Sequence, residues 1–137
     1  MPTRVLAIDD DPAMTDLLNL LLRAQGFDVI TANNGEDGVR YIQERSPDLV
    51  MLDLMMKGMD GWAFCTEVRK FSRIPILVLS ALDKPANVAS ALDAGADDYL
   101  IKPVPSGVLV AHINTLTRRN GMNKHKKSIP QALTYQI

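Results

Sequence analysis

The most constraining feature of this sequence is the run Leu49–Leu52, which is apolar at every position and is followed directly by Asp53. A strand that faces solvent on one side alternates apolar and polar residues, whereas a continuous apolar run is typical of a strand covered on both faces. Such strands are found in parallel sheets with helices on both sides. Asp53 lies where this strand should end, at the edge where open α/β sheets carry their functional crevice. The alternative interpretation is that Asp53 simply begins a polar turn.

Short apolar runs alternate with helical patterns along the rest of the chain. We expect strands at 5–8, 27–32, 49–52, 76–79 and 99–101. We expect helices from Pro12 to Gly26, between Gly35 and Pro47, over 61–70, between Asp83 as N-cap and Gly95 with Leu92 facing inward, and through Leu109 to near Gly121. Five strands alternating with five helices predict an α/β fold, namely a flavodoxin-like, doubly wound, five-stranded parallel sheet of order 2-1-3-4-5.

Length and composition predict a single folded domain of 137 residues in a reducing compartment. Cys65 is the one cysteine, so no intrachain disulfide is possible, and no apolar run reaches membrane-spanning length. We therefore expect a cytoplasmic protein. All 16 acidic residues and 10 of the 15 basic residues lie before residue 118, so this part has net charge −6 and the remainder +5. The basic end could contact an acidic partner, but a solvated helix end is the simpler interpretation.

Polar side chains follow four of the predicted strands. Asp9 and Asp10 follow the first, Asp53 the third, Ser80 ends the fourth and Lys102 follows the fifth. In the predicted strand order the first and third strands flank the switch point, so three carboxylates should share one crevice. Carboxylates that close repel one another unless a cation lies among them, and Mg²⁺ prefers such oxygen ligands. The sequence therefore predicts a Mg²⁺ site beside a hydroxyl and an ammonium group.

Six short motifs carry a resemblance to a known family. They are Ile8-Asp9-Asp10-Asp11-Pro12, Asp48-Leu49-Val50-Met51-Leu52-Asp53-Leu54-Met55-Met56, Gly58-Met59-Asp60-Gly61, Leu79-Ser80-Ala81, Gly95-Ala96-Asp97-Asp98-Tyr99 and Lys102-Pro103. Through them the chain resembles the receiver domain of bacterial two-component response regulators, from about Arg4 to Arg119.

The resemblance implies a role for each matching residue. Asp53 would accept a phosphoryl group from a histidine kinase or phosphotransfer protein, and Asp9, Asp10, Asp53 and the backbone carbonyl of Met55 would hold Mg²⁺. Ser80 and Lys102 would bind phosphoryl oxygens, and Ser80 and Tyr99 would form the switch. The Lys102–Pro103 bond is expected to be cis. Such a domain assists its own phosphorylation and slow dephosphorylation without being a conventional enzyme.

Two other function classes remain as alternatives. One is a Mg²⁺-dependent phosphatase that uses Asp53 as covalent nucleophile; those enzymes usually carry a second Asp two residues later, where this chain has Met55. The other is an interaction module that works without phosphorylation, which the complete set of acceptor-site residues disfavours.

The resemblance also divides the chain and suggests partners. We expect a receiver domain over 1–121 and a basic tail, or the start of an interdomain linker, over 122–137. An unknown output domain or partner protein should read the switch, and a phosphorylation-dependent homodimer is possible. We do not expect this segment to bind DNA or a membrane. Family members with DNA-binding domains usually carry charged partners on the last helix; here the matching positions include Val108, His112 and Asn114.

Overall fold

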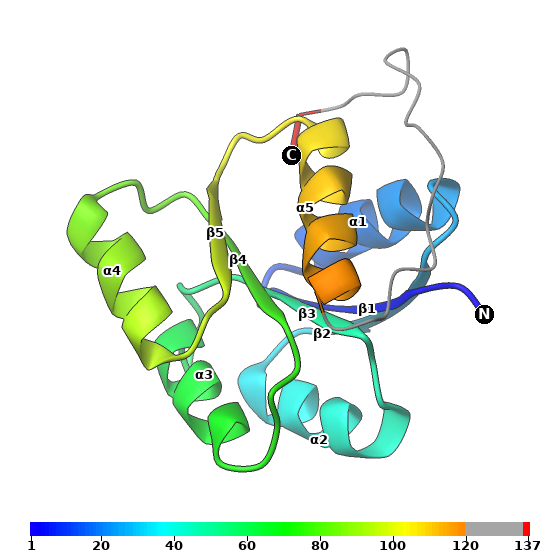
Figure 1. The fold of residues 1–137 in the computed structure, drawn as a ribbon. Coiled ribbons are helices and arrows are strands. Elements are labelled where there is room, and N and C mark those ends of the chain that lie inside the picture. The colour runs from blue at the N-terminus through cyan, green and yellow to red at the C-terminus, as the bar shows by residue number, and fades with distance from the viewer. Residues whose placement is uncertain (120–135) are drawn as a thin grey trace.

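The computed structural model describes residues 1–119 and 136–137, which form an α/β fold (Figure 1). The strands are β1 (Arg4–Ile8), β2 (Asp28–Ala32), β3 (Leu49–Leu52), β4 (Ile76–Ser80) and β5 (Asp98–Ile101). The helices are α1 (Pro12–Ala24), α2 (Gly35–Arg45), α3 (Gly61–Arg69), α4 (Pro85–Ala94) and α5 (Ser106–Arg119). The predicted alternation of five strands and five helices is confirmed.

All five strands are parallel, in the order β2-β1-β3-β4-β5. Helices α1 and α5 cover one face of the sheet, and α2, α3 and α4 cover the other (Figure 1). The predicted doubly wound topology is therefore correct. The chain reverses direction across the sheet between β1 and β3, which places the switch point at the carboxyl ends of these two strands.

Strand β3 explains why both faces need helices. All four of its residues are buried, and their side chains alternate between the two apolar clusters of the core. Leu49 and Met51 pack with residues of α1 and α5, whereas Val50 and Leu52 pack with residues of α2, α3 and α4. Removing either layer of helices would expose a continuous apolar stripe to water, at about 25 cal/mol for each Å².

The helix starts that face the site are capped by side chains. Asp11 accepts a hydrogen bond from the backbone N–H of Ala13 at α1, and Asp60 accepts one from Ala63 at α3. The predicted cap of α4 by Asp83 is wrong. The N-cap is Lys84, and within the described chain no side chain caps this helix. Pro85 at the first position removes one of the backbone N–H groups that a helix start leaves without a partner.

One further expectation is wrong, and two others concern residues that lie mainly outside the described range. Leu92 was expected to face inward, but its exposure is 43% because Ala91 takes the buried side of α4. The predicted tail, 122–137, lies outside the described residues apart from Gln136 and Ile137, as does the end of the last helix near Gly121. Within 1–119 and 136–137, no helix is long and apolar enough to cross a membrane.

Candidate functional site

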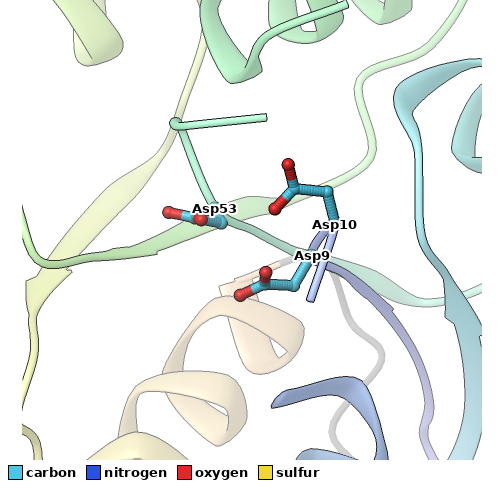
Figure 2. Close-up of side chains that lie close together, drawn as sticks. All are labelled: Asp9, Asp10 and Asp53. Atoms are coloured by element: carbon cyan, nitrogen blue, oxygen red, sulfur yellow. The ribbon is translucent and has the colours of Figure 1, made fainter. Parts of the chain in front are cut away.

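The three predicted carboxylates meet at the carboxyl ends of β1 and β3. The last residues of these strands, Ile8 and Leu52, are register partners, so the residues that follow them are brought together. One ligand oxygen from each of Asp9, Asp10 and Asp53 lies within 4.8 Å of the others. Figure 2 shows the three side chains gathered at this edge. Asp9 is buried, whereas Asp10 and Asp53 are partly accessible.

Asp9 accepts hydrogen bonds both on its side chain and on its backbone carbonyl. The backbone N–H of Asp11 donates to its Oδ1 atom at 2.9 Å. The Asn33 side-chain amide donates to the Asp9 carbonyl oxygen at 2.8 Å and to Thr15 Oγ1 at 3.0 Å. Asn33 follows β2 and Thr15 belongs to α1, so this amide ties two elements to the first acidic residue of the site.

Asp10 and Asp53 are held through the backbone. The Asp53 N–H donates to the Ile8 carbonyl at 3.1 Å, which continues the β1–β3 ladder by one residue. The Lys57 N–H donates to Asp10 Oδ2 at 3.1 Å, so Asp10 also anchors the loop between β3 and α3. Gly61 lies directly behind this loop: a Cβ atom there would come within 2.6 Å of Leu54 Cα and 2.9 Å of the Asp53 carbonyl oxygen.

The pKa of the Asp53 carboxyl is raised above its ordinary value. Burial is the largest cause, and the neighbouring Asp9 carboxylate adds to it. The charge of Lys102 and hydrogen bonds from the backbone of Met55 and Leu54 act in the opposite direction. Burial and the Asp9 carboxylate therefore disfavour the charged form of Asp53, as expected of a partly buried carboxyl group beside a like charge.

Lys102 lies beside the acidic cluster, as predicted. Its Nζ atom is 3.5 Å from Asp9 Oδ2, and both side chains are largely buried. The peptide bond between Lys102 and Pro103 is cis, which confirms that expectation. The ammonium group is thus held at the edge where the carboxylates meet.

The two predicted switch residues meet at a third residue, Leu82. Ser80 ends β4 and is fully buried, and its hydroxyl oxygen accepts a hydrogen bond from the Leu82 N–H at 3.2 Å. The Tyr99 hydroxyl donates to the Leu82 carbonyl oxygen at 2.7 Å. A displacement of the β4–α4 loop would therefore change the surroundings of both side chains.

Sequence reasoning missed how three residues shape the site. Asn33 was not among the predicted site residues, although an amide at the end of β2 follows the same strand-end pattern as the acids. Gly61 was assigned only to a helix start, and Leu82 acts through backbone atoms, which leave no sequence signal. The Met55 side chain is 60% exposed, and the assignment of its carbonyl as a metal ligand stays a prediction.

The donor set fits a small divalent cation. Three carboxylates within reach of one atom offer hard oxygen ligands, and a cation among them would offset the burial cost and the repulsion from Asp9 that raise the pKa of Asp53. Mg²⁺ suits such a set because it takes few protein ligands and keeps several waters. Asp9, Asp10 and Asp53 are the residues that would hold it.

Comparison with known proteins finds one family and a consistent fold. The family model described as the response regulator receiver domain matches residues 5–114. Among solved structures, the BeF3-activated N-terminal receiver domain of Klebsiella pneumoniae RstA has a TM-score of 0.81 and 33% identity, covering 85% of this chain and 99% of that one. A two-component response regulator from Clostridium difficile has a TM-score of 0.82 and 30% identity, covering 86% and 98%.

The similar curated proteins are longer than this chain. The transcriptional regulatory protein AfsQ1 of Streptomyces coelicolor is 43% identical over 119 residues, which are 87% of this chain and 52% of AfsQ1. The DNA-binding response regulator MtrA of Mycobacterium tuberculosis is 39% identical over 120 residues, which are 88% of this chain and 53% of MtrA. The chain therefore spans about half the length of these relatives.

Proposed function

The chain belongs to the response regulator receiver domain family, and from this premise we propose that it accepts a phosphoryl group on Asp53. The donor is the phosphohistidine of a histidine kinase or phosphotransfer protein. The observation that carries the proposal is the meeting of three carboxylates within 4.8 Å, with the Lys102 ammonium 3.5 Å from Asp9. Phosphoryl transfer needs positioned oxygens and neutralised charge more than covalent catalysis, and this arrangement supplies both.

Each residue has a defined task in the proposed transfer. An Asp53 carboxylate oxygen attacks phosphorus, the P–N bond to the donor imidazole breaks, and the imidazole leaves with the bonding electron pair and is protonated. Lys102 neutralises charge on the phosphoryl oxygens, while Asp9 and Asp10 bind the cation. Mg²⁺ bound there would neutralise charge on the transferring group. Asp53 must be ionised to attack, and a bound cation would favour this charged form, which burial and the Asp9 carboxylate disfavour.

The proposed output is a shift of the β4–α4 loop and β5. A phosphoryl group on Asp53 adds acceptor oxygens toward which the Ser80 hydroxyl can turn. When the Ser80 hydroxyl rotates in this way, it no longer accepts the hydrogen bond from the Leu82 N–H. The Leu82 carbonyl oxygen accepts a hydrogen bond from the Tyr99 hydroxyl, so the change reaches Tyr99. The surface near Tyr99 then differs between the two forms of the protein, and a partner can distinguish them.

The nature of that partner is also part of the proposal. MtrA is a DNA-binding response regulator, and by analogy we infer that this receiver controls an attached or separate output. We also propose that it works in the cytoplasm and is not a conventional enzyme. A homodimer formed on phosphorylation would have to form with two surface acids already engaged within the chain. Asp97 is paired with Arg69 at 2.9 Å and Asp98 with His112 at 2.5 Å, so both acids already have partners within the chain.

Labelling with a small phosphodonor tests the acceptor assignment. With acetyl phosphate and Mg²⁺, we expect intact mass measurement to show one added phosphoryl group on the wild type and on Asp16→Asn, an exposed control on α1. Asp53→Asn should show none. Full labelling of Asp53→Asn would refute the assignment. Steady release of phosphate from p-nitrophenyl phosphate would indicate the phosphatase alternative instead.

A further inference from the structure

An apolar groove separates α1 from α5 on the face of the sheet away from α3. It has a volume of about 360 Å³. Its walls include Leu17, Leu20 and Leu21 of α1 and Leu109 and Val110 of α5, and Ile137 also lines it. Leu20 is 68% exposed, so the groove opens to solvent along α1. The proposed phosphoryl transfer uses none of these residues.

The last two residues of the chain reach this groove and pair with the loop before α5. The Val104 N–H donates to the Ile137 carbonyl oxygen at 3.1 Å, and the Ile137 N–H donates to the Val104 carbonyl at 2.9 Å. Pro105 and Gln136 form an antiparallel bridge. Figure 1 shows the C-terminus beside the start of α5.

The side chains at this end alternate as in a strand. Gln136 is exposed, whereas Ile137 is 8% exposed and packs in the apolar cluster under α1 and α5. Val104 is 5% exposed, so its backbone N–H and carbonyl lie where an unmade hydrogen bond carries a desolvation cost. The loop thus offers one donor and one acceptor for an extended segment, and the groove offers a place for one aliphatic side chain. These are the two parts of recognition by strand addition.

We propose that the α1–α5 groove and the Val104 backbone form a binding site for an extended segment with an apolar side chain, occupied within the same molecule by Gln136–Ile137. Gln136–Ile137 is the occupant that the structure supports, because Ile137 already makes both backbone hydrogen bonds and its side chain packs along the wall of the groove. Val104 lies two residues after Lys102, so the contact also holds the far end of the loop that carries the site ammonium group.

Hydrogen exchange of the Val104 amide measures this contact without any phosphodonor, so its outcome is independent of the proposed function. Ile137→Asp places a charge in the groove, and Ile137→Pro removes the N–H that donates to Val104. We expect both to raise the Val104 exchange rate about fivefold to tenfold, as for loss of an ordinary hydrogen bond. Ile137→Val and the exposed Gln136→Ser keep the pairing and should exchange at the wild-type rate.

A second pair of variants tests the groove from its other wall. Leu17→Asp on α1 should also raise Val104 exchange, whereas Leu92→Asp, an exposed leucine on α4, should not. Unchanged Val104 exchange in Ile137→Asp and Ile137→Pro would overturn the proposal. Protection that increases with protein concentration would overturn occupancy within the same molecule and indicate the end of a second copy instead.

Discussion

At the residue scale, the ionisation of Asp53 links the stability of the protein to its chemistry. The folded protein raises the pKa of this carboxyl above its ordinary value of 3.8, chiefly through burial and then through Asp9. The native state therefore holds the proton to a higher pH than the unfolded chain does. The contribution of Asp53 to the free energy of unfolding therefore falls as pH rises from 3.8 through the raised pKa, because the native state binds more protons than the unfolded chain in that window.

Asp53→Asn should consequently stabilise the metal-free protein at neutral pH. The amide carries no charge, so it avoids both the burial cost and the repulsion from Asp9. The stability difference between variant and wild type should shrink as pH falls toward 3.8 and the wild-type carboxyl becomes protonated. Urea unfolding in chelator over a pH series measures it. A variant less stable than wild type at pH 7 would show that the Asp53 charge has a favourable partner in the metal-free state.

Asp10→Ala should separate metal binding from folding. It removes one carboxylate from the cluster, so Mg²⁺ should bind more weakly and labelling of Asp53 should slow. Stability without metal should change by less than about 1 kcal/mol, because relieved repulsion offsets the lost acceptor for the Lys57 N–H. Trp62 lines the same hollow as Asp10, so its fluorescence can follow the Mg²⁺ titration. Destabilisation by several kcal/mol would show that the Lys57 contact dominates.

The side chains of the site could be located from the sequence, because polar residues that follow parallel strands lie at the same edge of the sheet. Asp9, Asp53 and Lys102 follow strands whose carboxyl ends share one edge in a parallel sheet, and the apolar runs identify those strands. What could not be predicted is how these side chains are held. The amide of Asn33 reaches the Asp9 carbonyl across two elements, and Leu82 acts through its backbone. Neither contact follows from residue type or spacing.

At the element scale, the accuracy of prediction follows burial. Strand β3 and helix α3 bury wide apolar surfaces, so periodicity identifies them. Helix α4 buries Ala91 alone among its residues, and its start lacks a side-chain cap within the described chain. Here the expectations for Asp83 and Leu92 were wrong. A weakly amphipathic helix does not indicate which side faces inward, which explains the error for Leu92, and Lys84 takes the N-cap position in place of Asp83.

Gly61→Ala should show that α3 supports the acceptor loop. A methyl group there meets backbone atoms of Leu54 and Asp53, which cannot rotate away. We expect a loss of about 1–3 kcal/mol in stability and slower labelling of Asp53, as the loop shifts from the helix start. Thermal melts and the acetyl phosphate assay measure the two effects.

Gly58→Ala is the matched control for that variant. Gly58 has φ +72° with no atom within 4 Å of a new Cβ, so alanine costs about 1–2 kcal/mol through backbone strain alone. Its labelling rate should stay near wild type. Equal slowing in both variants would mean that stability, and not contact between α3 and the loop, controls the rate.

At the scale of the whole molecule, the sheet separates two tasks. The carboxyl ends of β1 and β3 gather the acids, while β4 and β5 carry Ser80 and Tyr99 toward the side covered by α4. Within the second region, the contacts through Leu82 join Ser80 to Tyr99. The strand order predicted this division, whereas the coupling of Ser80 to Tyr99 through the β4–α4 loop is visible only in the structure. Since that loop is the connection, its residues should affect both the signal and its duration.

The persistence of the phosphorylated molecule is the last prediction. Water must line up behind phosphorus to hydrolyse the acyl phosphate, and the resemblance to receiver domains implies that two positions influence its approach. Met55 is two residues after Asp53, and Leu82 is two residues after Ser80. Neither can orient a water molecule, whereas a carboxamide or carboxylate could do so by hydrogen bonding. We therefore expect slow self-dephosphorylation, with a separate phosphatase needed to end the signal.

Met55→Asn/Leu82→Glu should shorten the phosphoryl half-life at saturating Mg²⁺ after the donor is removed. Positioning one water is worth about 10- to 100-fold, or roughly 1.4 to 2.7 kcal/mol of barrier. Met55 is 60% exposed, so Met55→Asn alone should fold normally and give part of the effect, and Met55→Leu should leave the half-life unchanged. Leu82 packs against the core, so a melting curve of the double variant must accompany the assay. If the folded double variant loses its phosphoryl group at the wild-type rate or more slowly, apolar shielding does not set the lifetime. The next cause to test would then be the charge that Lys102 places beside the phosphoryl oxygens.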